Sequence, residues 1–97
     1  MVLIKENMEK AMTMLKNLLM NYVDKETIIN IHGNMNGITV RYSSKLEEFS
    51  VEQDGIYLVC GWFELNIEKN ITCIDYSEEE NSIHIKFFDG ELYLDIE

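Results

Sequence analysis

The chain has 97 residues and a formal net charge of −10 at pH 7. This length has room for one domain, 1–97, with a core of its own. The charge disfavours direct contact with nucleic acid or an anionic membrane, because such contacts need clustered Lys and Arg. Two cysteines are too few for a disulfide framework. The apolar segment at the start of the sequence is too short for a signal peptide. No apolar run reaches the about 20 residues that a helix needs to span a membrane. We therefore expect a cytoplasmic protein with reduced thiols.

The negative charge is unevenly distributed along the chain. Residues 1–26 contain four lysines and four acidic residues, so this part is neutral. Residues 27–97 contain four Lys or Arg and fourteen acidic residues, and so carry the whole excess. Such a field attracts basic surfaces. The expected partner is therefore a basic protein surface, such as that of a nuclease or another nucleic-acid-binding protein.

An amphipathic helix is predicted over about residues 5–23. Its start stays open between a cap at Asn7 and an earlier start near Leu3. Met14 and Met20 lie off the apolar stripe, and either widen the buried face or mark a second contact surface. The stripe recurs at three- and four-residue steps and comprises Met8, Ala11, Met12, Leu15, Leu18, Leu19 and Tyr22.

From Thr27 onward the apolar period changes to two, which predicts six or seven antiparallel strands. A run of strands after one helix is typical of the α+β class. Hairpin links predict a curved meander, open or closed into a small barrel, with the helix packed on it. Residues 64–67 either continue the fourth strand or start a new one after a bend at Gly61. The predicted strands are 27–32, 38–42, 48–52, 56–63, 71–76, 82–88 and 91–96.

The first hairpin has two open registers. The glycines and asparagines of residues 33–37 predict a tight reversal. A four-residue loop pairs Ile31 with Ile38. An Asn-Gly turn at residues 36–37 instead pairs Met35 with Ile38.

The last hairpin is predicted from the Asp-Gly pair at residues 89–90, which favours a type I′ turn between two alternating runs. With these two residues in the turn, His84 lies opposite Asp95. One face is then wholly apolar, and the other is polar with two aromatic residues, Phe88 and Tyr93.

Several apolar side chains are assigned to the core. The strand 56–63 is apolar on both faces, so we expect it to be central and covered. Trp62 and Phe63 are expected inside it. Cys60 and Cys73 lie in apolar strands, where a free cysteine behaves as a small hydrophobe.

The sequence contains no recognisable catalytic or metal-binding constellation. The soft metal ligands Cys60, Cys73, His32 and His84 do not have the spacing of a zinc site. A pair of His84 with Asp95 is half of a nucleophilic triad, but no nucleophile elbow accompanies it. We interpret this pair as a solvated surface contact, and expect no enzymatic activity, no metal and no cofactor.

Acidic and aromatic residues at the C-terminal end form the candidate partner-binding surface. Aromatic side chains in an acidic field are typical of hot spots for a basic target. Alternatively, the helix or another strand covers the aromatic residues, and the acidic run 78–80 is only a solvated loop. The candidate residues are Glu78, Glu79, Glu80, Phe88, Glu91, Tyr93 and Asp95.

The leading hypothesis is a non-catalytic acidic protein that occludes a basic, nucleic-acid-binding site on its partner. In size and charge the chain is similar to phage-encoded anti-defence proteins, including anti-CRISPR inhibitors, and to toxin-immunity proteins. A second hypothesis is an assembly module that forms a homo-oligomer through its helix methionines or an open sheet edge. A third is a small-ligand barrel lined by Trp62, Tyr57 and Tyr42.

Overall fold

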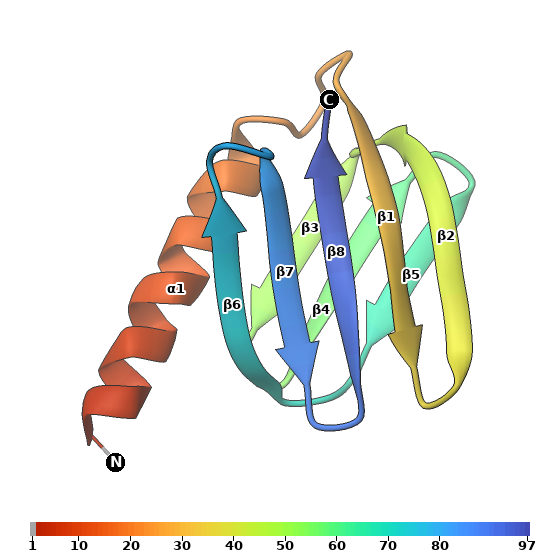
Figure 1. The fold of residues 1–97 in the computed structure, drawn as a ribbon. Helices are drawn as coiled ribbons and strands as arrows, with labels where there is room; N and C mark the ends of the chain where they lie inside the picture. The colour runs from red at the N-terminus through yellow and green to blue at the C-terminus, as the bar shows by residue number, and fades with distance from the viewer. Residues whose placement is uncertain (1) are drawn as a thin grey trace.

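The computed structural model describes residues 2–97, and their side chains from Met8 onward. One helix, α1 (Val2–Met20), precedes eight strands (Figure 1). The expected α+β class is confirmed. The strands are β1 (Ile28–Met35), β2 (Ile38–Lys45), β3 (Glu48–Glu52), β4 (Gly55–Cys60), β5 (Phe63–Ile67), β6 (Ile71–Ser77), β7 (Ser82–Phe87) and β8 (Gly90–Ile96).

The strands form two antiparallel sheets instead of one continuous meander or a closed barrel. The larger sheet has the order β2-β1-β8-β7-β6, and the smaller has the order β3-β4-β5. The chain leaves the larger sheet after β2, builds the smaller one, and returns with β6. The pairing of β1 with β8 then joins the two halves of the larger sheet. Each sheet has an apolar face, and stacking the two faces buries both.

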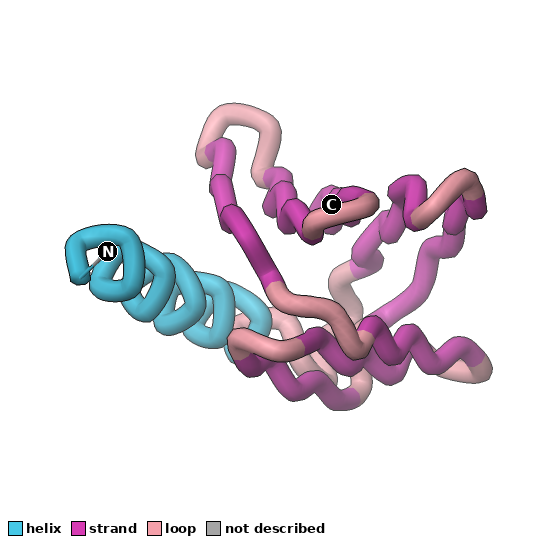
Figure 2. Tube along the Cα trace, turned by 90° about the horizontal axis from the view of Figure 1, so that it is seen from below, coloured by secondary structure: helices cyan, strands magenta, loops and turns pink. Residues whose placement is uncertain are grey.

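The core lies between the two sheets, which Figure 2 shows as two layers seen from below. Strand alternation explains which side chains enter it, because every second residue points to the same face. The fully buried side chains from the larger sheet include Ile29, Ile31, Ile83, Ile85, Leu92 and Leu94, and those from the smaller sheet include Val51, Ile56, Leu58 and Cys60.

Helix α1 lies along one side of the two-sheet stack, where it packs against β6 and β3 (Figures 1 and 2). The predicted stripe is buried at Met12, Leu15 and Leu19. Met20 lies off the stripe and is 62% exposed. The helix ends earlier than predicted, and Asp24 beyond it adopts a left-handed φ of 58° that turns the chain toward β1.

The β1–β2 turn settles the register that the sequence leaves open. Asn36 and Gly37 have φ values of 54° and 86°, and Met35 pairs with Ile38. Two successive positive φ angles are the requirement of a type I′ turn, which Asn and Gly accept readily. The second of the two predicted registers is therefore confirmed.

The predicted register of the last hairpin is wrong by two residues. Phe87 pairs with Gly90, so Phe88 and Asp89 form the turn. Gly90 is instead needed in the strand, because a Cβ there would come within 2.5 Å of Asn34 O and of Met35 Sδ on β1. A shift of two preserves the apolar face but changes every opposite partner.

The prediction that Trp62 belongs to the core is also wrong. Gly61, with a φ of 65°, and Trp62 form a two-residue turn that pairs Cys60 with Phe63. Gly61 therefore reverses the chain and splits one predicted strand into β4 and β5. Trp62 projects at the tip and is 99% exposed, whereas Phe63 is half-buried and stacks on Tyr42 at 4.6 Å between ring centroids.

The two cysteines have different surroundings. Cys60 is buried as predicted, and burial, together with the charge of Glu47, raises the pKa of its thiol to about 11. Cys73 was expected in the core, but it lies half-exposed on β6, opposite Lys86.

Among residues 2–97, no helix combines the length and apolar character needed to cross a membrane.

The contribution of α1 to the core can be tested with Leu15→Ala. Leu15 has no exposed surface, so the substitution leaves a cavity between helix and sheets. We expect the free energy of unfolding to fall by about 3 kcal/mol, measured by urea denaturation. Met20→Ala is the matched control on the same helix, and should change that free energy by less than about 0.5 kcal/mol. Equal effects of the two variants would contradict the described packing.

Candidate functional site

The residues predicted to bind a partner are spread over the length of the larger sheet. Strand β8 places Glu91, Tyr93 and Asp95 on the outer face, where α1 does not cover them (Figure 1). Phe88 is 95% exposed in the β7–β8 turn. The exposed run 78–80 forms the β6–β7 turn, at the opposite end of β7 (Figure 1). The structure thus brings the three β8 residues together, places Phe88 beside Glu91 on the rim of one hollow, and holds the run 78–80 apart from Phe88 at the other end of the sheet.

Tyr93 is stacked between two histidines from the neighbouring strands. Its ring centroid lies 5.0 Å from that of His32 on β1 and 4.1 Å from that of His84 on β7, with nearly parallel planes. Desolvation, followed by the charges of Glu91 and Asp95, raises the pKa of the Tyr93 phenol. Both faces of the Tyr93 ring are therefore occupied within the chain, and only its edge and hydroxyl face outward.

Asp95 is paired with His32, and the predicted pair of His84 with Asp95 is wrong. His32 Nε2 donates to Asp95 Oδ2 at 2.7 Å, and Ser82 Oγ donates to Asp95 Oδ1 at 2.5 Å. The shifted hairpin register is the cause, because it places Tyr93 opposite His84. The carboxylate lies between the serine and the histidine, so His32 is not placed to take a proton from Ser82.

The pKa of Asp95 reflects two opposing effects. Partial burial alone would raise it, but the hydrogen bonds from Ser82 and His32 and the charge of His32 together hold it below the usual value. His84 Nε2, by contrast, lies 3.4 Å from Glu91 Oε2. Polar contacts on this face therefore run across β1, β8 and β7 and tie the three strands together.

The outer face of the larger sheet carries charges of both signs. Glu91 and Asp95 share it with Arg41 on β2 and Lys86 on β7, which the strand register places on the same face. Opposite charges interspersed in this way largely cancel at a distance. The part of the predicted surface that lies on β8 therefore does not carry charge of a single sign.

The outer face of the smaller sheet carries acidic residues and no base of its own, and Lys16 of α1 reaches its edge at Glu52, with 3.9 Å between Nζ and Oε1. Glu48 and Glu52 alternate on β3 with the inward-pointing Phe49 and Val51, and Glu64 is exposed on β5. The sequence signal for this face is visible without a structure. Residues 46–68, which build the whole sheet, contain six acidic residues and no Lys, Arg or His: Glu47, Glu48, Glu52, Asp54, Glu64 and Glu68.

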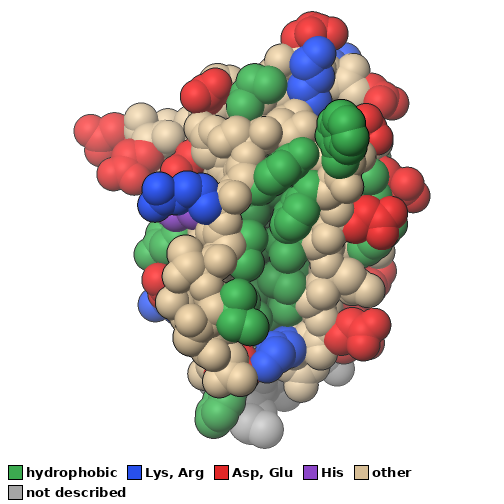
Figure 3. All heavy atoms as spheres, turned by 90° about the vertical axis from the view of Figure 1, so that its right-hand side faces the viewer, with side chains coloured by type: hydrophobic (Ala, Val, Ile, Leu, Met, Phe, Trp, Pro, Cys, Tyr) green, Lys and Arg blue, Asp and Glu red, His purple; other side chains and the backbone are tan. Residues whose placement is uncertain are grey.

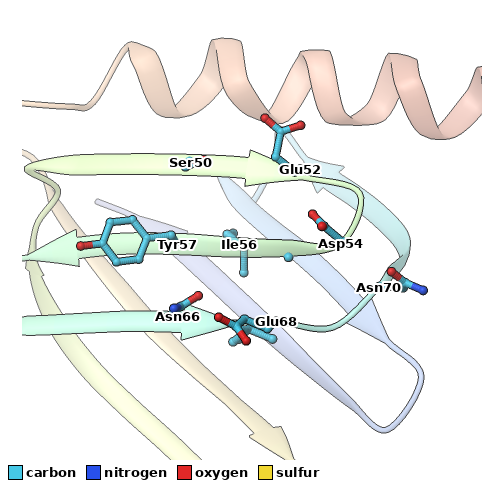
Figure 4. A pocket seen from close by; sticks show the side chains of 10 residues that line it. Ser50, Glu52, Asp54, Ile56, Tyr57, Asn66, Glu68 and Asn70 are labelled. Carbon is cyan, nitrogen blue, oxygen red and sulfur yellow. The ribbon is translucent and has the colours of Figure 1, made fainter.

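A shallow hollow of about 450 Å³ lies on this face (Figure 4). Tyr57 lies on β4 between β3 and β5, with Asn66 on β5 beside it. Glu52 and Asp54 lie toward the β3–β4 turn, and Glu68 follows β5. Carboxylates and amide oxygens are the acceptors that ammonium and guanidinium groups prefer.

Tyr57 is the central aromatic residue of this hollow. Desolvation, followed by the negative charges of Glu64 and Glu48, raises the pKa of its phenol. A phenol is protonated at neutral pH even at its ordinary pKa of about 10, so this hydroxyl can both donate and accept. We use the name acidic face for Glu48, Glu52, Asp54, Tyr57 and Glu64 together.

The three aromatic residues of the ligand-barrel hypothesis do not line a common cavity. Trp62 projects from a turn, Tyr57 lies on the outer face of the smaller sheet, and Tyr42 packs on Phe63. Within the described part of the chain, no group of three or more His, Cys, Asp or Glu side chains is arranged to hold a metal ion.

No family model, curated protein or solved structure matches the chain.

The lowered pKa of Asp95 makes a prediction about acid stability. A carboxylate whose pKa is lower in the folded state stabilises the fold above the unfolded pKa of about 3.9, and this contribution is lost as the pH falls through the folded pKa. The difference in free energy of unfolding between the wild type and Asp95→Asn should therefore shrink as the pH falls below about 4. Urea denaturation at a series of pH values measures it.

Ser82→Ala provides an independent check, because it removes one donor to Asp95 and leaves the carboxylate in place. Its acid-dependent loss of stability should be smaller than that of the wild type. A wild-type to Asp95→Asn difference that does not change between neutral and acid pH would contradict the assignment.

Proposed function

We propose that the chain is a non-catalytic binding protein whose acidic face binds a basic surface on a partner protein. The single observation that supports this is the segregation of charge: residues 46–68 carry six carboxylates and no base, and they fold into one small sheet with an exposed outer side. A concentrated field of one sign steers a partner of opposite charge and raises its association rate.

The hollow around Tyr57 gives this surface a point of close contact. A lysine or arginine side chain that enters it meets Glu52, Asp54 and Glu68 as charge partners, and the Tyr57 ring as a cation–π partner. Tyrosine is also enriched among the interface residues that contribute most to affinity. The acidic field would then set the rate of encounter, and the hollow the lifetime of the complex.

The partner class that fits best is a protein with a nucleic-acid-binding site, such as a nuclease. Such sites need clustered Lys and Arg to contact phosphates, and an acidic face competes for the same side chains. Anti-defence inhibitors, including anti-CRISPR proteins, and toxin-immunity proteins would act in this way. The proposal therefore predicts that partner binding and nucleic-acid binding exclude one another.

Two variants with the same change in net charge test which surface binds. Glu48→Gln/Glu52→Gln/Asp54→Asn neutralises three of the four carboxylates of the acidic face, and Glu78→Gln/Glu79→Gln/Glu80→Gln neutralises the turn predicted from the sequence. All six side chains are exposed, so both variants should fold. A partner is first captured from extract of the native host cell with the wild-type chain at low salt. Its association rate with each variant is then measured, and its DNA binding is assayed with and without the chain.

We expect the acidic-face variant to associate on the order of tenfold more slowly at low salt, and its rate to depend less on salt. The turn variant should stay within about twofold of the wild type, since its charges lie outside the acidic face. A slower rate in the turn variant alone would assign binding to residues 78–80. A partner that binds DNA and the chain together would contradict occlusion.

A further inference from the structure

The stack of two sheets is closed on one side and open on the other. Helix α1 covers the side formed by β6 and β3. On the opposite side, formed by β2 and β5, Figure 3 shows a strip of hydrophobic side chains in a hollow between two ridges. No other element of residues 2–97 covers this strip.

The residues on this side are apolar and include two of the most exposed hydrophobic side chains. Tyr42 from β2 stacks on Phe63 from β5 across the opening, and both are only partly buried. Ile38 at the start of β2 is 68% exposed, and Trp62 just before β5 is 99% exposed. A contiguous apolar strip with a fully exposed tryptophan is typical of an interaction surface.

Both strands that border the strip have an unpaired edge. Strand β2 pairs with β1 only, and β5 pairs with β4 only. Their outward N–H and C=O groups are therefore available to another strand, and exposed edges of this kind are templates for pairing between chains. A molecule that binds this side should therefore provide strands that pair with the two edges, and apolar side chains that cover the strip.

The two edges carry opposite charges. Residues 27–45 contain no acidic residue, and β2 exposes Arg41 and Lys45 on its outer face. Lys45 also contacts Glu26, with 2.6 Å between Nζ and Oε2. The outer face of β5 presents Glu64, and Glu68 follows the strand directly. Charge complementarity therefore exists between one edge of this chain and the other edge of the same chain.

We propose that the occupant is a second copy of this chain, related by a two-fold axis that runs parallel to the strands. Strands β2 and β5 run in opposite directions (Figure 1). Rotation about an axis along the strands preserves their directions, and it places β2 of one copy antiparallel to β5 of the other. Both contacts form twice, as an isologous dimer requires.

One register of this pairing places the charged side chains of the two edges opposite one another. Alternate residues of a strand share a face, and the charged residues on each edge are four positions apart, with a polar residue midway. Both sets lie on outer faces, so they meet on the same side of each composite sheet. The register pairs Lys45 with Glu64, Ser43 with Asn66 and Arg41 with Glu68 of the second copy.

The competing two-fold arrangement is disfavoured by charge. An axis perpendicular to the sheets would pair β2 with β2 and β5 with β5. Arg41 and Lys45 would then lie against the same basic residues, and Glu64 and Glu68 against the same acidic ones. Like charges directly opposite in a sheet are destabilising.

The dimer uses one edge of the surface proposed to bind a partner, because Glu64 of the acidic face and Glu68 of the hollow pair across the interface. Glu48, Glu52 and Asp54 belong to β3 and the following turn, and β4 separates β3 from the interface. These three carboxylates stay accessible in the dimer, and the variants that test the proposed function leave Glu64 and Glu68 unchanged, so either proposal can fail without the other. The net charge of −10 on each copy opposes association at long range, so burial of the apolar strip has to outweigh that repulsion.

The test uses two full-length variants and sedimentation velocity. Arg41→Glu/Lys45→Glu makes both edges acidic, and Glu64→Lys/Glu68→Lys makes both edges basic. All four side chains are exposed, and circular dichroism checks that each variant folds. We expect the wild type to be a dimer, and each variant alone to dimerise on the order of a hundredfold more weakly. An equimolar mixture of the two variants should restore a dimer, because each acidic edge then meets a basic one.

The matched control is Lys10→Glu/Lys86→Glu, which makes the same charge change away from the β2 edge and should leave the dimer within about threefold of wild type. A wild type that sediments as a monomer at every attainable concentration would overturn the proposal. So would an Arg41→Glu/Lys45→Glu variant that dimerises as tightly as the wild type, since that result indicates β2–β2 pairing.

Discussion

The pairing of β1 with β8 is the contact on which the rest of the structure depends. It joins the β1–β2 hairpin to the three consecutive strands β6–β8, which makes one five-stranded sheet. Two glycines make the approach close enough: a side chain at Gly33 would meet the backbone of Glu91, and one at Gly90 would meet Asn34 and Met35. With this pairing in place, the larger sheet presents a continuous apolar face to which the smaller sheet and α1 add.

The same pairing separates the charges of the chain. Because β1, β2, β6, β7 and β8 complete one sheet among themselves, residues 46–68 are left to form a sheet of their own. All charged side chains of residues 46–68 are carboxylates. The larger sheet retains the basic residues and pairs Asp95 with His32. A layer with charges of both signs therefore lies against a layer whose own charged residues are all acidic, with Lys16 of α1 paired to Glu52 at its edge.

Local patterns in the sequence predict local structure here, and contacts across the fold decide the rest. The helical stripe and the Asn36-Gly37 turn follow from side-chain periodicity and from φ angles that few residues accept. The predicted Asp89-Gly90 turn is wrong because Gly90 has to lie in β8, where β1 leaves no room for a side chain. Strand β1 lies more than fifty positions earlier in the sequence, so the local pattern does not reveal this contact. The prediction that Trp62 lies in the core is wrong because hydrophobicity alone does not distinguish a core side chain from an exposed one at a turn. The acidic face is predictable from the sequence, because residues 46–68 contain six acidic residues and no Lys, Arg or His.

The β1–β8 contact also bears on how the chain folds. Hairpins such as β3–β4 and β4–β5 close short loops, whereas β1 has to find a partner at the far end of the described chain, and closing a long loop costs more entropy. During synthesis the smaller sheet can therefore assemble first. Strand β1 keeps one edge unsatisfied until β8 has been made, and that interval is when the nascent protein is most open to mispairing.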